Sequence, residues 1–167
     1  TWLTTTAGPN KNVPHTWSAQ DLGAVNAGFT NNLALGKLTI DVSTNNGRAT
    51  FRSVSGNQAL YVDYVELLND ATNFNRTLAI LPSLTIYFAN ANVPVEKLDG
   101  AVGGRFRWVS SFAGPLSTTN ILYPSGASYP FNSALIASLD IDSNNNGVPN
   151  ALDRYPIDVP DEKIPMD

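Results

Sequence analysis

Apolar and polar residues alternate in several short stretches of this chain, and each such stretch predicts a β-strand. The clearest is Leu38-Thr-Ile-Asp-Val42, in which every second side chain is apolar. The turn sequence Asn45-Asn-Gly47 follows it and leads into a second stretch, Arg48 to Arg52. Because Asn-Gly supplies the positive φ that tight turns require, these two strands are expected to pair as a hairpin.

Further strands are expected at 60–67, 78–81, 84–88, 105–109 and 120–123, with Pro or Gly between several of them. The first of these is apolar on both faces apart from Asp63 and Glu66, which indicates a central strand or one lying under another layer. Short helices are expected at 18–26, capped by Ser18, and as one turn at 132–137. The pattern predicts an all-β fold, a β-sandwich or jelly roll with short helical turns.

One domain is expected, because 167 residues of which 43% are hydrophobic can bury a substantial core. The sequence is interpreted as a β-sandwich over 1–139, a calcium-binding loop over 140–154 and an extended C-terminal tail over 155–167. No apolar run approaches the roughly 20 residues of a membrane span. The first residues lack the basic and apolar regions of a signal peptide, so Thr1 is expected to begin a processed or excised segment.

The loop from Asp142 to Asp153 carries the strongest chemical signal in the chain. Calcium takes six to eight oxygen ligands, and a twelve-residue loop provides them from alternate positions, with a glycine at the sixth for a sharp turn. Gly147 holds that sixth position. The expected ligands are the side chains of Asp142, Asn144, Asn146, Asn150 and Asp153 and the backbone carbonyl of Val148. The predicted cofactor is therefore Ca²⁺.

The stretch DSNNNGVPNALD resembles the calcium repeats of thrombospondin type 3 segments and dockerins. It departs from them in carrying neutral Asn144 and Asn146, and it closes with Asp153 rather than a longer glutamate. Fewer carboxylates imply weak binding, with a Kd of about 10⁻⁴ to 10⁻³ M, as in extracellular modules. No second loop with amphipathic helices follows, so cohesin binding is not expected.

The composition favours a secreted or cell-surface protein. Only 14% of residues are charged, and the formal net charge of −4 provides no basic surface for nucleic acid. The sequence contains no cysteine, which excludes disulfides, thiolate metal sites and thiol catalysis. Calcium is then the plausible internal cross-link for an extracellular chain.

The sequence offers little for catalysis, and no enzymatic activity is expected. The single histidine, His15, is interpreted as a surface or packing residue, and no Gly-x-Ser-x-Gly motif is present. Paired carboxylates of a glycosidase could come from Asp63, Glu66, Glu96 and Asp99. Asp63 and Glu66 lie three apart on one strand, however, so separate salt bridges or positions at loop ends are expected for them.

Aromatic side chains provide a second candidate site, because flat rings can stack against sugars. Most are expected to fill the core. Trp17, Tyr87 and Tyr123 lie beside turns or on the polar phase of a strand, and they are the candidates for stacking on a ligand at the surface.

A broader resemblance covers about half of the chain. The stretches VEKLDGAVGGRFRWVSSFAGP and DIDSNNNGVPNALDRYPID resemble a β-rich repeat near the carboxyl ends of very large secreted bacterial proteins. The resemblance implies an extracellular, non-catalytic module. The expected function is a calcium-stabilised structural module that assembles with copies of itself, through its tail or an edge strand, into a filament or surface layer. The alternative is a carbohydrate-binding module of a secreted bacterial enzyme, with polysaccharide as its partner.

Overall fold

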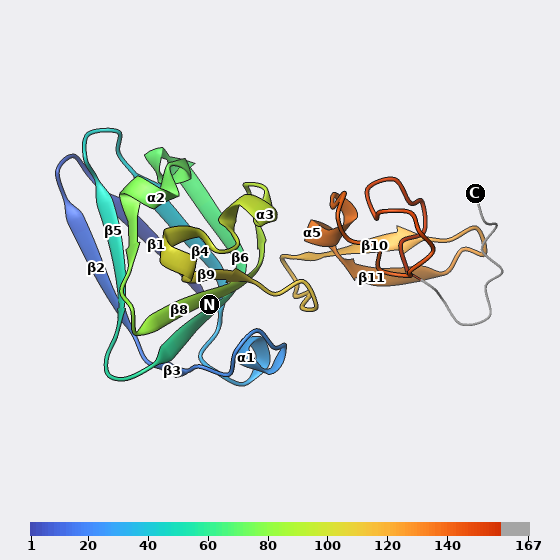
Figure 1. Cartoon of the computed structure of the whole chain (residues 1–167), viewed down its shortest axis with the longest axis horizontal. Helices are drawn as coiled ribbons and strands as arrows, with labels where there is room; N and C mark the ends of the chain where they lie inside the picture. Colours follow the sequence, from blue (N-terminus) through green and yellow to red (C-terminus); the bar gives the residue numbers. More distant parts are fainter. Residues whose placement is uncertain (158–167) are drawn as a thin grey trace.

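The computed structural model describes residues 1–157, and their strands form three sheets (Figure 1). The largest sheet has the order β1-β4-β6-β8-β9, with a short strand, β3, paired to β6; the second has the order β2-β5-β7; the third is the hairpin β10-β11. The strands are β1 (Trp2–Ala7), β2 (Asn12–Trp17), β3 (Ala19–Gln20), β4 (Leu35–Val42), β5 (Arg48–Ser53), β6 (Gln58–Asn69), β7 (Leu78–Ile80), β8 (Leu84–Ala91), β9 (Phe106–Trp108), β10 (Thr118–Leu122) and β11 (Ser128–Asn132). The expectation of a strand-rich chain is confirmed.

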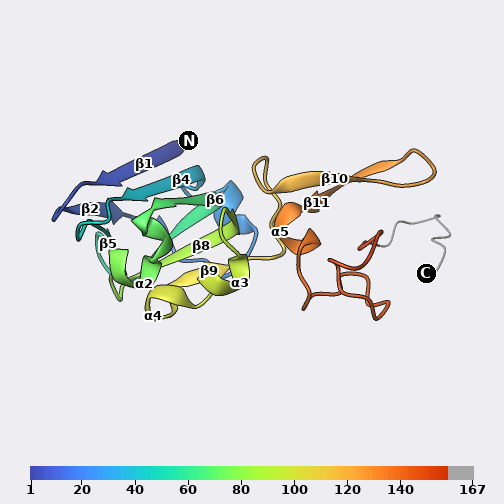
Figure 2. The ribbon, with the colours of Figure 1, turned by 90° about the horizontal axis from the view of Figure 1, so that it is seen from above.

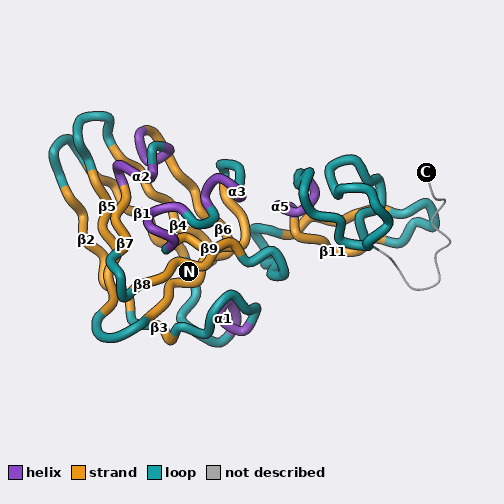
Figure 3. Tube along the Cα trace, viewed as in Figure 1, coloured by secondary structure: helices purple, strands orange, loops and turns teal. Residues whose placement is uncertain are grey.

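Helices are short and lie between the strands, as Figure 3 shows. They are α1 (Ala27–Thr30), η1 (Asp70–Thr72), α2 (Phe74–Thr77), α3 (Val95–Leu98), α4 (Ala101–Gly104) and α5 (Ser133–Ile136). The turn expected near 132–137 is confirmed as α5, and Asn132 caps it by accepting a hydrogen bond from Ala134 N. The helix expected at 18–26 is wrong, because this stretch contains β3 and α1 begins only at Ala27. Among residues 1–157, no helix is long and apolar enough to cross a membrane.

The chain winds as a parallel β-solenoid, since it passes back and forth between the two larger sheets and each turn lies on the one before. Apart from the short β3–β6 contact, every pairing in these sheets is parallel. Thr4 of β1, for example, pairs with Thr39 of β4, which pairs with Glu66 of β6. The pairing therefore does not show the expected sandwich or jelly roll, which would be built from antiparallel hairpins.

The hairpin expected between residues 38–42 and 48–52 is wrong, since β4 and β5 belong to different sheets. The turn between them carries the chain around a corner of the solenoid. It lies against the equivalent turn of the first coil: Asn10 N donates to Asn45 O at 2.7 Å, and Asn46 and Asn10 both have a φ of +54°. Gly47 passes so close to that turn that a Cβ on it would lie 2.7 Å from Ala7 O. Contact with the turn at residues 7–10, which is distant in sequence, thus determines the conformation of the turn at residues 45–47.

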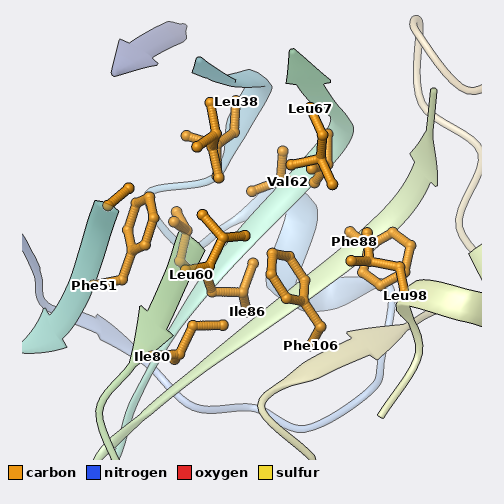
Figure 4. Close-up of a cluster of buried hydrophobic side chains, with 14 of the residues drawn as sticks. Leu38, Phe51, Leu60, Val62, Leu67, Ile80, Ile86, Phe88, Leu98 and Phe106 are labelled. Atoms are coloured by element: carbon orange, nitrogen blue, oxygen red, sulfur yellow. The ribbon is translucent and has the colours of Figure 1, made fainter. Parts of the chain in front are cut away.

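The core lies inside the coil, where the two larger sheets face each other. Side chains from both sheets are fully buried there, including Leu38, Phe51, Leu60, Ile86 and Phe106 (Figure 4). Each such side chain contributes about 1.5–3 kcal/mol relative to an exposed one. The alternation in the sequence therefore identified an inward face correctly, although it did not specify the strand partners.

Two neighbouring strands of the largest sheet, β4 and β6, change their alternation at the same level. In β4 both Leu35 and Leu38 point into the core, and in β6 both Val62 and Val65 do, so the two-residue alternation shifts between them. The pairing between β4 and β6 correspondingly passes from Leu35↔Val62 directly to Lys37↔Tyr64. Asp63 lies between Val62 and Tyr64, where this change occurs.

The C-terminal part of the described chain is a smaller unit beside the solenoid, containing the hairpin, α5 and a long irregular loop (Figure 2). Its own cluster of buried aromatic residues centres on Tyr123 and Tyr155. Asp63 joins the two parts, because its carboxylate accepts hydrogen bonds from Leu116 N at 2.8 Å and from the Ser117 hydroxyl. The solenoid thus gives way to the hairpin unit near residues 110–117, well before the boundary expected at 139.

Candidate metal centre and open sheet edge

The loop from Asp142 to Asp153 is anchored to the hairpin unit by Asn150. This side chain is 1% exposed, and its Oδ1 accepts from Ser143 N at 3.0 Å. Its Nδ2 donates to Leu135 O at the end of α5 and to Ser143 Oγ. Asn150 therefore holds the two ends of the loop together, and its amide is directed away from the other expected ligands.

Four of the expected ligand side chains converge on one another. Asp153 Oδ2 accepts from Asn144 Nδ2 at 3.2 Å and from Asn146 Nδ2 at 3.0 Å. On the other side of the loop, the Asp142 carboxylate accepts from Gly147 N at 2.7 Å and from Asn146 N at 3.3 Å. Gly147 has a φ of +90°, which gives the sharp turn expected of the sixth position. The loop thus gathers two carboxylates and two amides.

This donor set suits a hard cation. The two carboxylates supply oxygen directly. To turn Oδ1 of Asn144 and of Asn146 to where Nδ2 now lies, the amides would have to give up the hydrogen bonds with Tyr155 O and Val148 N, in exchange for the cation. With the Val148 carbonyl and water, the total reaches the six to eight oxygens that calcium prefers. Among residues 1–157, no three His, Cys, Asp or Glu side chains lie together as a metal site, so any cation here would depend on amide and carbonyl oxygens.

The first residues of the expected tail are packed against the hairpin unit. Tyr155 and Pro156 are buried, the ring of Tyr155 stacks on that of Tyr123 at 5.0 Å between centroids, and the Tyr123 hydroxyl donates to Ile157 O at 2.5 Å. The first three residues of the expected tail, 155–157, are thus packed on the hairpin unit. The rest of the expected tail, 158–167, lies outside the described residues.

Two of the three aromatic residues expected to stack on a ligand, Tyr87 and Tyr123, are held inside the protein. Tyr87 is 9% exposed, stacks on Tyr61 and donates to Asp21 Oδ1 at 3.1 Å; burial, together with the Asp21 charge, raises the pKa of Tyr87 to about 12. Tyr123 is 2% exposed and packs among other tyrosines. Their expected place at the surface is wrong, because their rings complete small aromatic clusters. Trp17 is half-buried and lines a groove of about 340 Å³ beside Leu33.

The acids considered as paired catalytic carboxylates have separate partners. Asp63 binds the 114–117 turn, as described above, and Glu66 forms a salt bridge with Lys37 at 2.9 Å. Asp99 accepts from Trp108 N and lies 3.3 Å from Arg107 Nε. Glu96 lies in the first turn of α3. The salt bridge expected for Glu66 is confirmed, whereas Asp63 is held by uncharged donors.

The edge strands at the two ends of the solenoid differ in whether other parts of the chain cover their backbone groups. At the β9 end, Gly100 N donates to Phe106 O and the Asp99 carboxylate accepts from Trp108 N, so the backbone beyond β9 is occupied. The helices α3 and α4 contact β9 there. This edge is therefore covered.

At the other end of the large sheet, no strand among residues 1–157 pairs with the outer side of β1. Thr1 O accepts a hydrogen bond from Gly36 N of β4, and Ala7 O accepts one from Ser43 N just after β4, which places the odd-numbered residues of β1 toward β4. The backbone groups of Trp2, Thr4 and Thr6 then point away from the sheet. In β2, Lys11 O and Trp17 O accept hydrogen bonds from the β5 side, so the even-numbered Pro14 faces away from β5. Proline has no N–H to donate to a further strand, and the outer edge of β2 is therefore blocked there. Within the described residues, β1 thus presents an edge of the largest sheet to which another strand could be added.

Sequence reasoning missed this edge because it did not assign the first two strands. The stretch Trp2-Leu-Thr-Thr-Thr-Ala7 does alternate between exposed and inward positions, and its β-branched threonines favour a strand. Pro14 was a further signal, since a proline within a strand indicates an edge.

The chain was compared with protein-family models, with curated proteins and with solved structures, and none of them matches it.

Proposed function

We propose that this chain is a non-catalytic, calcium-stabilised structural module that acts outside the cell and assembles with copies of itself into a filament or surface layer. The open edge of β1 is the observation that carries this proposal. An edge strand with unpaired N–H and C=O groups can accept a strand from another chain, and proteins usually block such edges. Here β2 is blocked by Pro14 and β9 is covered, whereas β1 is neither.

The favoured contact joins β1 of one copy to β1 of another. Two identical edges related by a two-fold axis pair antiparallel, and this arrangement closes after two copies. Growth into a filament or layer then needs a second contact, for which residues 158–167 are our candidate. Pro160 and Pro165 make this segment a poor strand donor, so we do not assign it to the β1 edge.

In this proposal calcium stabilises the hairpin unit rather than the assembly edge. Asp142 and Asp153 would hold the ion with Asn144, Asn146 and the Val148 carbonyl, and the ion would fix the direction of the chain after α5. The low surface charge supports an extracellular setting, and it limits repulsion between copies.

The test is Thr4→Pro, which removes an N–H that faces the free edge and leaves the hydrogen bonds to β4 intact. Thr4→Val is the matched control, because it keeps that N–H. Analytical ultracentrifugation should show dimers for the parent and for Thr4→Val, and monomers for Thr4→Pro. Deletion of residues 158–167 should leave dimers and remove larger assemblies in negative-stain electron microscopy. A parent that remains monomeric at high concentration, or a Thr4→Pro variant that assembles equally well, would refute the proposal.

A further inference from the structure

A row of large side chains lies on the outer face of the largest sheet. Trp2 of β1 pairs in register with Lys37 of β4, which pairs with Tyr64 of β6. Because residues in register on adjacent parallel strands point to the same side, all three side chains lie on one face. The ammonium of Lys37 is 5.9 Å from the centroid of each ring, so it sits between the two aromatic residues.

The indole of Trp2 lies against the sheet with most of its surface in solvent. Gly36 is beneath it: a Cβ on Gly36 would be 3.6 Å from both Cδ1 and Nε1 of the indole. The residue is nevertheless 72% exposed. A tryptophan this exposed, resting on a glycine, presents a broad apolar surface to a ligand.

Polar groups beside this row are fixed by their own hydrogen bonds. Glu66 Oε2 binds Lys37 Nζ at 2.9 Å and accepts from Thr39 Oγ1 at 2.9 Å. These bonds lower the pKa of Glu66, chiefly through Lys37, so the carboxylate is charged at neutral pH. Thr4 and Thr6 lie exposed on the same face of β1. The face thus combines aromatic rings with an ion pair of zero net charge and several hydroxyls.

The row has a defined end on the side of the hairpin unit. Asn90 of β8 pairs in register with Tyr64 of β6. Its Nδ2 donates a hydrogen bond of 2.7 Å to Oγ of Ser133, the first residue of α5. The hairpin unit therefore borders the face next to Tyr64. At the other side the face runs out to the open edge at β1.

We propose that this face, formed by Trp2, Lys37, Tyr64 and Glu66, binds a neutral polysaccharide of extended, β-linked sugars. The apolar C–H faces of such sugars stack on aromatic rings, while their equatorial hydroxyls bond to carboxylate, ammonium and threonine groups. Trp2 and Tyr64 are two strands apart, roughly 10 Å, so one flat chain lying across the strands can contact both rings. The balanced charge favours a neutral chain over a polyanion. This binding is independent of the assembly proposed above.

The test uses the full chain and microcrystalline cellulose and chitin as probes, with starch granules as an α-linked comparison. The parent is expected to be retained on cellulose or chitin and not on starch. Trp2→Ala and Tyr64→Ala should each weaken retention roughly tenfold, the effect that loss of one stacking ring has on nucleic-acid bases. Tyr64→Phe should bind as the parent does, because it keeps the ring. Leu122→Ala is the control, since it removes a side chain 69% exposed on β10.

Thermal melts will show that Trp2→Ala remains folded, because so exposed a side chain adds little to the core. Absence of retention of the parent on both β-linked probes would overturn the proposal, as would equal retention of Trp2→Ala, Tyr64→Ala and Leu122→Ala. Loss of dimers in Trp2→Ala without any loss of retention would also overturn it, and would assign the face to contacts between copies.

Discussion

Asp63 is a buried carboxylate whose partners are uncharged, and it connects the two parts of the molecule. It is 4% exposed and accepts from Leu116 N and Ser117 Oγ. Asp63→Ala would leave these donors without an acceptor in a buried site, and each such loss costs about 1–3 kcal/mol. We expect the free energy of unfolding, measured by urea denaturation, to fall by about 2–4 kcal/mol.

Asp99→Ala is the matched control for Asp63→Ala. Asp99 also accepts a backbone hydrogen bond and has a cationic neighbour, but its side chain is 38% exposed. Exposed pairs of this kind contribute about 0.2–1 kcal/mol. Equal destabilisation by the two substitutions would show that burial of Asp63 does not matter.

His15 predicts a pH dependence of stability. Its Nε2 lies 2.7 Å from Thr5 Oγ1, its ring stacks on Phe51, and burial lowers its pKa below 6.5. The unfolded chain therefore binds a proton at a higher pH than the folded one, and the stability present above pH 6.5 is lost as pH falls below that value. We expect the Tm of the parent to fall from pH 7.5 to pH 5.5 more steeply than that of His15→Phe, which keeps the stacked ring. Parallel Tm curves for the two proteins would contradict this assignment.

Helix α1 docks on the solenoid through a glycine. A Cβ on Gly28 would lie 2.0 Å from Cε1 of Tyr61, a fully buried ring whose hydroxyl donates to Gly23 O. Gly28→Ala must therefore displace either α1 or the ring, and overpacking of this kind costs about 1–3 kcal/mol.

Gly8→Ala is the control for Gly28→Ala, because nothing lies within 4 Å of a Cβ on Gly8 and its φ is not positive. Differential scanning calorimetry should show a Tm several degrees lower for Gly28→Ala and nearly unchanged for Gly8→Ala. A similar Tm for both variants would mean that α1 contributes little to the stability of the solenoid.

At the level of elements, alternation located strands but could not assign their partners. The stretches around Leu38, Phe51 and Ile86 were identified as strands because each has an inward apolar face, and this face exists in any β architecture. Asn45-Asn-Gly47 was interpreted as a hairpin turn, since local sequence favours one. Its actual conformation depends on Asn10 and Ala7, which lie a whole coil away. Pairing of this kind is set by contacts distant in sequence, and no local pattern encodes it.

The calcium site stays a prediction, but the course of the loop that would hold it was easier to predict than the fold, because the loop is local. Asp142, Asn144, Asn146 and Asp153 do converge, since their spacing alone brings them round one turn. Asn150 occupies a correct position in the sequence pattern but is used to anchor the loop to Leu135. Whether a side chain faces the loop centre or the supporting unit depends on packing against α5, which the spacing does not describe.

The molecule as a whole has two parts of unlike construction, and calcium should affect only one of them. The solenoid has a large apolar core, whereas the hairpin unit rests on a few aromatic residues and the loop. Binding to the folded state adds about 2.7 kcal/mol when calcium is 100 times its Kd. With the Kd of about 10⁻⁴ M expected for extracellular modules, 10 mM calcium reaches that ratio.

Calcium at 10 mM should therefore raise the Tm of the hairpin unit by about 10–20 °C. Asp142→Ala and Asp153→Ala should abolish this rise, so that each variant melts at the same temperature in calcium and in chelator. Asn145→Gly is the control, because Asn145 occupies a position without ligand function and its φ of +57° suits glycine. Hydrogen exchange should show the added protection within residues 133–157 and leave β4 and β6 unchanged. A calcium effect that survives in Asp142→Ala, or protection spread through the solenoid, would place the ion elsewhere.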